Sequence, residues 1–376
     1  MSFNLIRNSR VFFTTLDPVT GVVPSSGFDA TNTYELQVLD GFSFSQASTT
    51  ETVTLNEAGA TPVRGQRSFN TALEAVDFSF STYMRPQDGG TNITAEEAIL
   101  WNAMFSDVAI GETGAAWTNG TTKATCTVAN SERHQLQKFG LIVVIDGTTF
   151  VIDNCVLDTA TIDFGLDAIA AIAWTGKGAT LRQIASPTLS GTTTVTLSGS
   201  LSGTANGKNV TAPYIANKLS TVTLDAGIGV GGTSYNVALT GGNITISNNV
   251  SYLTPANLGV VNKPATYFTG TRSIKGSLNA YLRSGSGNTG ALMAALLTSA
   301  DSDTDPAYYL KIVIGGSNPT HVDLTMPAVM VSIPSVSTEQ VVSTSLEFTA
   351  QGSASGVFDV GTANELTVEY YTTNAA

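Results

Sequence analysis

The feature that most constrains the fold is an internal repeat with a period of about half the chain. Six segments of the first half recur in the second half in the same order, each with a similar pattern of apolar and polar residues. The matched segments are 6–17 with 215–225, 42–45 with 244–247, 80–85 with 278–283, 94–106 with 289–299, 141–147 with 310–316, and 172–175 with 346–349. Because chance alternation does not give six elements in one order, the sequence predicts a duplicated domain.

Composition favours β-structure in both copies. Charged residues make up 12% of the chain, against a usual ~25%, and Ser, Thr and Gly in their place are typical of strands and turns. We therefore predict a mainly β fold with two tandem homologous β-sandwich or barrel domains, each with one short flanking α-helix. The predicted domains are residues 1–185 and 213–376. A Ser/Thr/Gly-rich linker at 186–212, with one short strand at 194–197, should join them.

One helix is predicted in each half. In the first half it runs from Thr94 to Ser106, because Thr94 and Glu97 have the spacing of a capping box and apolar residues follow at helical spacing. In the second half it runs from Thr289 to Ser299. The apolar stripes are Ile99, Leu100, Ala103 and Met104 in the first helix, and Leu292, Met293, Leu296 and Leu297 in the second.

Motifs for cofactor and metal binding are incomplete. Residues 227–232 fit the pattern G-x-G-x-x-G, but an alternating strand at 234–239 follows where a dinucleotide site needs a helix. We therefore predict a hairpin tip. Asp301, Asp303 and Asp305 begin like a calcium loop, but the glycine and glutamate that an EF-hand needs are missing, which predicts a solvated acidic loop.

The signals for catalysis are also weak. His134 and His321 have no partners at zinc-ligand spacing, and the chain contains no G-x-S-x-G motif. Cys126 and Cys155 are too few for a disulfide scaffold and are predicted to be buried, reduced thiols. We therefore expect no enzymatic activity, no catalytic residues, no metal site and no cofactor.

Other classes are excluded by charge and hydropathy. No run of 18 apolar residues exists, so no membrane-spanning helix is predicted. Arg7 and Arg10 stand where a signal peptide needs an apolar run, so we expect a protein that is not exported. A net charge of −12 argues against a basic groove that grips nucleic acid.

The segment Val53–Phe69 is long for a hairpin connection, which usually has 2–5 residues. It is rich in turn formers and carries one acid and two arginines. One interpretation is a floppy surface loop. The other is an arm that reaches a neighbouring subunit and fixes it through Arg–carboxylate pairs. The candidate contact residues of this arm are Asn56, Glu57, Arg64 and Arg67.

Four stretches, in order along nearly the whole chain, resemble the major tail tube protein of long-tailed siphophages, of the type that fuses two tube domains. They are 2–14, 56–65, 78–86 and 242–255. The resemblance implies homotrimeric, pseudo-hexameric rings that stack around a tape measure protein, with tail-tip and tail-terminator proteins at the ends of the tube. It also implies a virion-tail location after assembly in the host cytoplasm, and passage of double-stranded DNA without sequence-specific binding. Since few residues follow Phe348, we expect no C-terminal immunoglobulin-like domain.

Two alternatives stay open. The inner tube of a contractile tail or of a secretion-like machine would have the same fold, whereas a β-sandwich adhesin or glycan-binding protein would need a secretion signal and clustered exposed aromatics. For a DNA conduit we expect a lumen lined by acidic or neutral side chains with its bases paired. A basic wall would hold the duplex by its phosphates.

Overall fold

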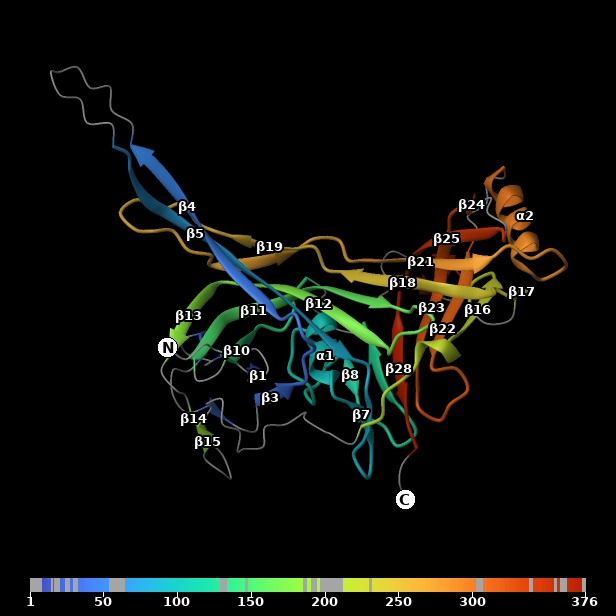
Figure 1. The fold of residues 1–376 in the computed structure, drawn as a ribbon, viewed down its shortest axis with the longest axis horizontal. Helices are drawn as coiled ribbons and strands as arrows, with labels where there is room; N and C mark the ends of the chain where they lie inside the picture. The colour runs from blue at the N-terminus through green and yellow to red at the C-terminus, as the bar shows by residue number, and fades with distance from the viewer. Residues whose placement is uncertain are drawn as a thin grey trace, which may run out of the picture.

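A computed structural model of the 376-residue chain gives the arrangement shown in Figure 1, in which the two halves lie side by side along the longest axis. The structure describes residues 9–14, 16, 21–23, 28–29, 33–53, 65–128, 134–145, 148–184, 188–190, 195–196, 212–229, 232–301, 307–337, 341–354, 357–358 and 364–373. The helices are α1 (Ala98–Phe105) and α2 (Thr289–Ala300), with a 3-10 turn at Asn217–Leu219.

The described strands confirm the prediction of a mainly β fold. In the first half they are β1 (Ser9–Thr14), β2 (Phe28–Asp29), β3 (Thr33–Leu36), β4 (Ser43–Val53), β5 (Arg67–Tyr83), β6 (Pro86–Asp88), β7 (Ile93–Ala95), β8 (Trp117–Thr118), β9 (Ala124–Thr127), β10 (Phe139–Ile145), β11 (Thr148–Asp163), β12 (Ala171–Gly178) and β13 (Thr180–Ile184). Then follow β14 (Thr188–Ser190), β15 (Val195–Thr196), β16 (Thr221–Ala226), β17 (Ser234–Tyr235), β18 (Leu239–Ser247), β19 (Val250–Leu253), β20 (Thr266–Thr269), β21 (Ser273–Tyr281), β22 (Tyr308–Ile314), β23 (His321–Val331), β24 (Ser335–Ser337), β25 (Ser343–Ala350), β26 (Ser353–Ala354), β27 (Val357–Phe358) and β28 (Thr367–Tyr371).

Two layers of strands form the first half. One layer has the order β3–β1–β10–β11–β13, and the other has the order β4–β5–β12–β11. Strand β11 belongs to both layers, and its register with β12 shifts between Leu157 and Thr159. A bulge of this kind bends a strand, so β11 can form the corner between the layers. Aromatic rings meet across the layers, for example Phe78 and Phe139 at 6.3 Å between centroids.

The second half has the same order of pairing. Its layers are β17–β16–β22–β23–β28 and β18–β21–β25–β23, and β24 continues beyond β23 along the edge of β25. One cluster of buried apolar side chains runs through both halves, from Val11 of β1 to Tyr370 of β28. The chain is therefore two similarly paired units that share a continuous core.

The strand registers correct three of the sequence matches. With Leu141 matched to Leu310, the residue that corresponds to Leu224 is Phe13, not Leu16. The other two matches shift by two residues. Phe80 and Leu278 occupy the same position in the repeat, so the residues that pair with them in the neighbouring strands must also correspond to each other. The corrected correspondences are Trp174 with Leu346, not with Phe348, and Phe44, not Phe42, with Ile244. Alternation does not fix this shift, because a slip of two residues keeps every side chain on its own face of the sheet.

An aromatic–glycine pair occupies the same ladder position in both halves. Phe78 lies opposite Gly176, and a Cβ on Gly176 would stand 2.3 Å from the Phe78 ring. In the second half Gly276 lies opposite Phe348, and a Cβ on Gly276 would stand 2.5 Å from that ring. The ring covers a glycine in both halves, with the two residue types exchanged between the strands.

Helix α1 begins at Ala98, four residues later than predicted. Thr94 lies in β7, so the predicted capping box does not form, and Glu97 makes no side-chain cap bond. All eight residues of α1 are buried, which makes it an enclosed helix rather than a surface helix with one apolar stripe. Helix α2 starts where predicted, ends one residue later, and buries only one face.

The predictions for the connecting segments are partly confirmed. Strand β15 lies inside the strand predicted at 194–197, and β14 pairs in parallel with β2. Strands β16 and β17 form the predicted hairpin around the glycine-rich motif, although β17 ends at Tyr235 rather than at 239. Residues 230–231 of that motif and most of the acidic loop, including Asp303 and Asp305, lie outside the described residues.

Candidate assembly interface

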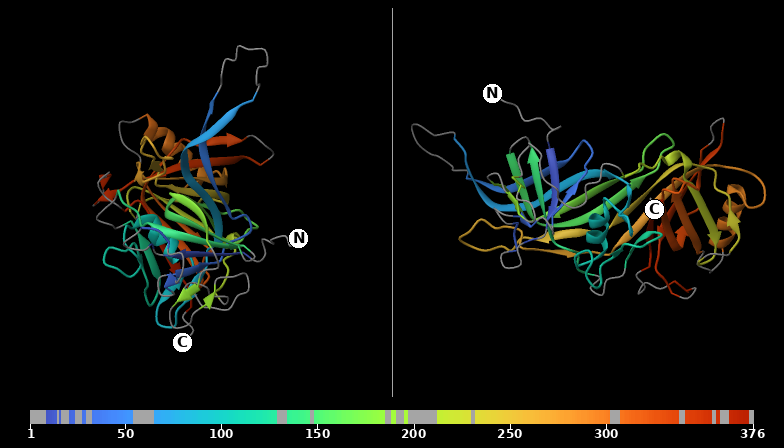
Figure 2. Two further views of the ribbon diagram at one scale, coloured as in Figure 1. Left: turned by 90° about the vertical axis from the view of Figure 1, so that its left-hand side faces the viewer. Right: turned by 90° about the horizontal axis from the view of Figure 1, so that it is seen from below.

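The hairpin of β4 and β5 projects far beyond the body of the molecule (Figures 1 and 2). Its strands stay paired as far as Val53 and Arg67, so Val53 and 67–69 belong to the strands and not to the predicted loop. The outer part of the hairpin is exposed on both faces, and Phe69 is 55% exposed. A two-stranded hairpin without cover is marginal in water, which makes this hairpin a candidate contact element.

The predicted contact residues of the arm are only partly described. Arg67 is the first residue of β5 and is exposed. Asn56, Glu57 and Arg64 lie outside the described residues, so their predicted ion pairs stay a prediction.

A second hairpin, formed by β19 and β20, lies between β18 and β21, as the arm lies between β4 and β5. It rests on the first half, where the Tyr267 hydroxyl donates to the Leu136 carbonyl oxygen over 2.7 Å. Val250 packs against Leu136 and the fully buried Val156. The second half thus contacts the first half through the β19–β20 hairpin, which occupies the same position in the repeat as the arm does in the first half.

The two halves also join edge to edge, because β11 pairs with β18. Ile162 and Ile244 are opposite each other in this ladder, and both are fully buried. On the other face of the sheet, the hydroxyls of Thr161 and Thr245 are 3.2 Å apart. The junction therefore has an apolar inner side and a polar outer side.

Two strands that correspond to β18 and β11 in the repeat, β4 and β24, have an outer edge with no partner strand within the described residues. Strand β4 pairs only with β5, and β24 pairs only with β25. Apolar side chains lie along the free edge of the second half, where Met330 is 49%, Ile333 50% and Val336 38% exposed. Unpaired edges are normally protected because they invite pairing with another chain.

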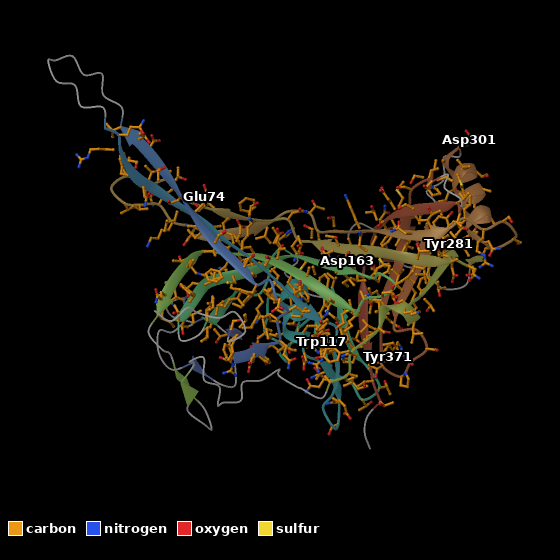
Figure 3. The ribbon with its side chains drawn as sticks, in the orientation of Figure 1. Glu74, Trp117, Asp163, Tyr281, Asp301 and Tyr371 are labelled. Atoms are coloured by element: carbon orange, nitrogen blue, oxygen red, sulfur yellow. The ribbon has the colours of Figure 1, made fainter. Side chains whose placement is uncertain are left out.

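One face of the joined sheet β4–β5–β12–β11–β18–β21–β25 carries the core, and the opposite face is polar. A row of six hydroxyl residues crosses that polar face from strand to strand: Ser43, Ser79, Thr175, Thr159, Ser247 and Ser273. The hydroxyls of Ser43 and Ser79 are 2.8 Å apart. Lys177 pairs with Asp77 on this face at 2.6 Å, and Asp163 and Tyr281, labelled in Figure 3, also belong to it. The polar face is thus rich in hydroxyls, and its charged side chains also include Lys275 of β21 and Glu347 of β25.

A buried polar cluster ties α1 to the second half. The hydroxyl of Tyr370 on β28 donates to Glu97 Oε1 over 2.5 Å, and Trp101 Nε1 donates to the Tyr370 oxygen over 2.8 Å. Burial raises the pKa of the Glu97 carboxyl to about 7 and also raises the pKa of Tyr370. Arg85 pairs with Glu96 at 3.1 Å and donates to the Ala212 carbonyl oxygen. The sequence motifs do not predict this cluster, although an acid directly before a mostly apolar helix is a visible signal.

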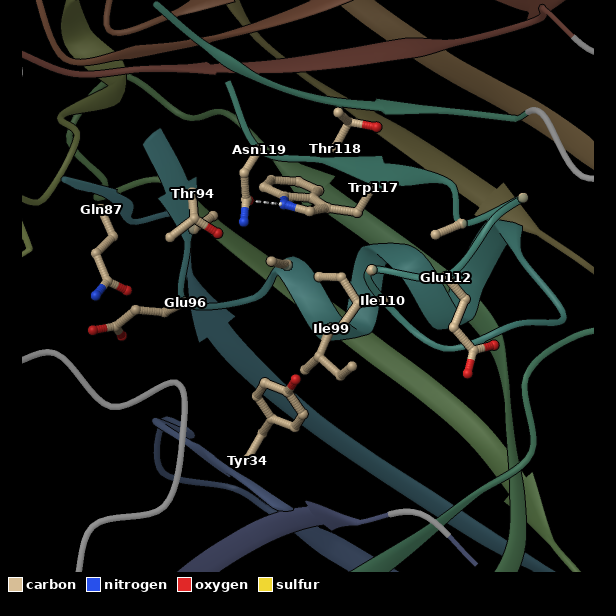
Figure 4. Close-up of a pocket in the computed structure, with 15 residues that line it drawn as sticks. Tyr34, Gln87, Thr94, Glu96, Ile99, Ile110, Glu112, Trp117, Thr118 and Asn119 are labelled. Carbon is tan, nitrogen blue, oxygen red and sulfur yellow. Dashed lines mark hydrogen bonds between the residues drawn. The ribbon is translucent and has the colours of Figure 1, made fainter. Parts of the chain in front are cut away.

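A cavity of about 630 Å³ lies beside α1 (Figure 4). Tyr34 of β3, the β6–β7 hairpin and the segment 110–119 form its walls. On one wall Trp117 Nε1 donates to Asn119 Oδ1 over 2.7 Å, and on another Glu96 is held by Arg85. These polar side chains of the lining are therefore already hydrogen-bonded to neighbouring residues around α1.

The predictions for cysteines, metal ligands and membrane-spanning helices can be compared with the described residues. Cys126 and Cys155 are free, buried thiols, as predicted, and burial raises the pKa of each. Within the described part of the chain, no three His, Cys, Asp or Glu side chains gather as metal ligands would. Of the helices described, none is both long and apolar enough to cross a membrane.

Comparison with known proteins gives a match to a phage tail tube protein. The tail tube protein pb6 of Escherichia phage T5 is 32% identical to this chain over 367 residues, which cover 93% of this chain and 73% of pb6. No protein-family model matches the chain.

Proposed function

Because the chain belongs to the family of siphophage tail tube proteins, we propose that it polymerises into rings of three chains that stack into a tube and conduct double-stranded DNA. It is a structural protein of the phage virion and is located in the tail. The proposal assigns it no catalytic residue, and assembly takes place in the host cytoplasm.

In this proposal residues 1–185 and 213–376 are two tube domains of common origin, joined by the linker at 186–212. The equal order of strand pairing in the two halves supports this division. The exchanged pairs of Phe78 with Gly176 and Gly276 with Phe348 support it at the level of single residues. The two domains would alternate around the ring and give it pseudo-hexameric symmetry.

The observation that carries the proposal is the edge-to-edge junction of β11 and β18 within one chain. It leaves one matching free edge at each end of the joined sheet, on β4 and on β24. A surface whose two ends complement each other generates a closed ring when the rotation per subunit permits. Three chains would then contribute six similar junctions, three within chains and three between chains.

Ring closure would turn the polar face of the sheet toward the axis. The core and the second layer of strands cover the other face, so their bulk can lie only on the outside of a closed barrel. The resulting wall would be lined by hydroxyls, with Lys177 paired to Asp77 and with Lys275 and Glu347 exposed on it. A wall with few basic side chains suits a passing duplex, because bases would bind its phosphates.

The projecting hairpin is the proposed contact between subunits or between stacked rings, with Asn56, Glu57, Arg64 and Arg67 as its contact residues. Its exposure on both faces supports this role, because a partner would supply the missing cover. Further proposed partners are the tape measure protein in the lumen, and tail-tip and tail-terminator proteins at the ends of the tube.

Native mass spectrometry of assembled rings, together with electron microscopy of the same sample, tests the proposal. We expect hollow tubes in the images and a mass of three chains per ring. Six chains per ring would overturn the alternation of two domains. Discrete monomers at every concentration would overturn the tube.

A further inference from the structure

We infer that β24 of one chain pairs with β4 of a second copy, in the register that β11 and β18 use within the chain. This inference rests on the proposed ring and specifies its closing junction. It follows from comparing the two ends of the joined sheet with the junction that the chain already contains.

Strand β24 takes the place of the last residues of β11. Both segments pair with the strand that follows them, β25 and β12 respectively, at equivalent ladder positions. With Trp174 matched to Leu346, the equivalent pairs are Thr161–Ala173 with Ser335–Ser345, Ile162–Ile172 with Val336–Thr344, and Asp163–Ala171 with Ser337–Ser343. Strand β4 takes the place of β18 in the same way, since Phe44 corresponds to Ile244.

Exposure distinguishes the filled junction from the open one. Ile162 is fully buried beside β18, whereas its counterpart Val336 is 38% exposed. Val156 is fully buried under the β19–β20 hairpin, whereas its counterpart Met330 is 49% exposed. At the open end, apolar side chains are therefore exposed at the positions where the filled junction has buried apolar side chains. This difference is expected if a strand equivalent to β18, from a second copy of the chain, covers the open end.

The register follows by transfer of the ladder partners. Within the chain Thr161 faces Thr245, Ile162 faces Ile244 and Asp163 faces Asn243. Between chains the facing pairs become Ser335 with Ser45, Val336 with Phe44, and Ser337 with Ser43. The apolar pair then lies on the core side and the serines lie on the polar face. A slip of one residue between the chains would place Val336 opposite a serine of β4, so that the core-side and polar-face side chains of the two strands no longer match.

The same transfer predicts where the arm lies. Strands β4 and β5 beyond the junction correspond to the β19–β20 hairpin, so they would cover Met330 of the neighbour as that hairpin covers Val156. Ring closure would thus give the projecting hairpin part of its missing cover.

Cysteine cross-linking tests the register. Residues facing each other in an antiparallel pair have Cα atoms about 4.5–5.5 Å apart, which lies in the range that a disulfide spans. Assembled rings of Ser335→Cys/Ser45→Cys are oxidised and run on a non-reducing gel, where we expect loss of the monomer band to covalent dimer and trimer. The native thiols of Cys126 and Cys155 are buried, so the designed pair is the reactive one.

The matched control is Ser335→Cys/Phe44→Cys, whose side chains point to opposite faces. Equal cross-linking in both variants, or none in either while electron microscopy still shows rings, would overturn the register and leave the proposed function standing. Absence of rings from the unmodified chain would overturn the proposed function itself. A covalent trimer from the first pair alone, with no larger species, supports the junction and the closed ring together.

Discussion

Replacing Glu97 by Gln should stabilise the chain in a pH-dependent way. The Glu97 side chain is buried, with 1% of its surface exposed, and accepts hydrogen bonds from the Tyr370 hydroxyl and from the Arg85 backbone N–H. A glutamine has the shape of the protonated acid and keeps an oxygen that can accept from Tyr370. It carries no charge that burial could penalise.

The magnitude follows from the raised pKa. The Glu97 carboxyl titrates near 4.5 in the unfolded chain and near 7 in the folded one. Between these pH values the folded state binds more protons, so the free energy of unfolding of the natural chain falls as pH rises. At about 1.4 kcal/mol per pKa unit, the loss is about 3 kcal/mol above pH 7 and none below pH 4.5. The Glu97→Gln variant avoids this loss.

Urea unfolding of monomeric protein, followed by tryptophan fluorescence at pH 4.5, 6 and 8, measures the effect. The free energy of unfolding of Glu97→Gln minus that of the natural chain should rise from about zero to about 3 kcal/mol across this range. The control Glu347→Gln removes an exposed carboxylate from β25 and should change little. A difference that stays constant with pH would refute the assignment of a destabilising charge to Glu97.

Two further outcomes are expected. Deletion of residues 58–66 should leave a folded monomer that does not polymerise, because exposed loops tolerate shortening and subunit contacts do not; normal tubes in electron micrographs would make the arm a surface loop only. Tubes carrying Ser79→Lys/Thr175→Lys should bind duplex DNA in filter-binding assays, with an affinity that falls as salt rises, since each Lys that neutralises a phosphate adds about 0.9 to the salt slope. Equal binding by the control Ser79→Ala/Thr175→Ala would contradict the proposed orientation of the sheet.

Local patterns predicted local elements well. Alternation and helical spacing located most strands of the repeat and the start of α2, because these signals depend on neighbours in sequence. The start of α1 was predicted wrongly for the opposite reason. Thr94 and Glu97 have capping-box spacing, but the Glu97 carboxylate bonds to Tyr370, 273 residues away in the chain.

The candidate interface was predictable only in part. Turn formers and arginines marked Val53–Phe69 as an unusual connection, and the structure extends its strands into a projecting hairpin. The β11–β18 junction was not foreseen, because alternation reports which face a side chain takes and not which strand lies beside it. The contact of the β19–β20 hairpin with the first half was not predicted either, because it depends on Tyr267 and Val250, whose partners lie far away in sequence.

The first half carries two insertions, and the segments at the matching positions of the second half are much shorter. Strands β6–β7 stand between β5 and α1, and β8–β9 stand between α1 and β10, whereas only 282–288 and 301–307 fill the matching positions. In the proposed ring of three chains, the inner wall would repeat six times, because both halves contribute to it. The cavity that the insertions line would occur three times, because the insertions belong to the first half. A tail component that recognises the insertions would bind with a stoichiometry of three per ring, while the duplex inside would meet six near-equivalent surfaces.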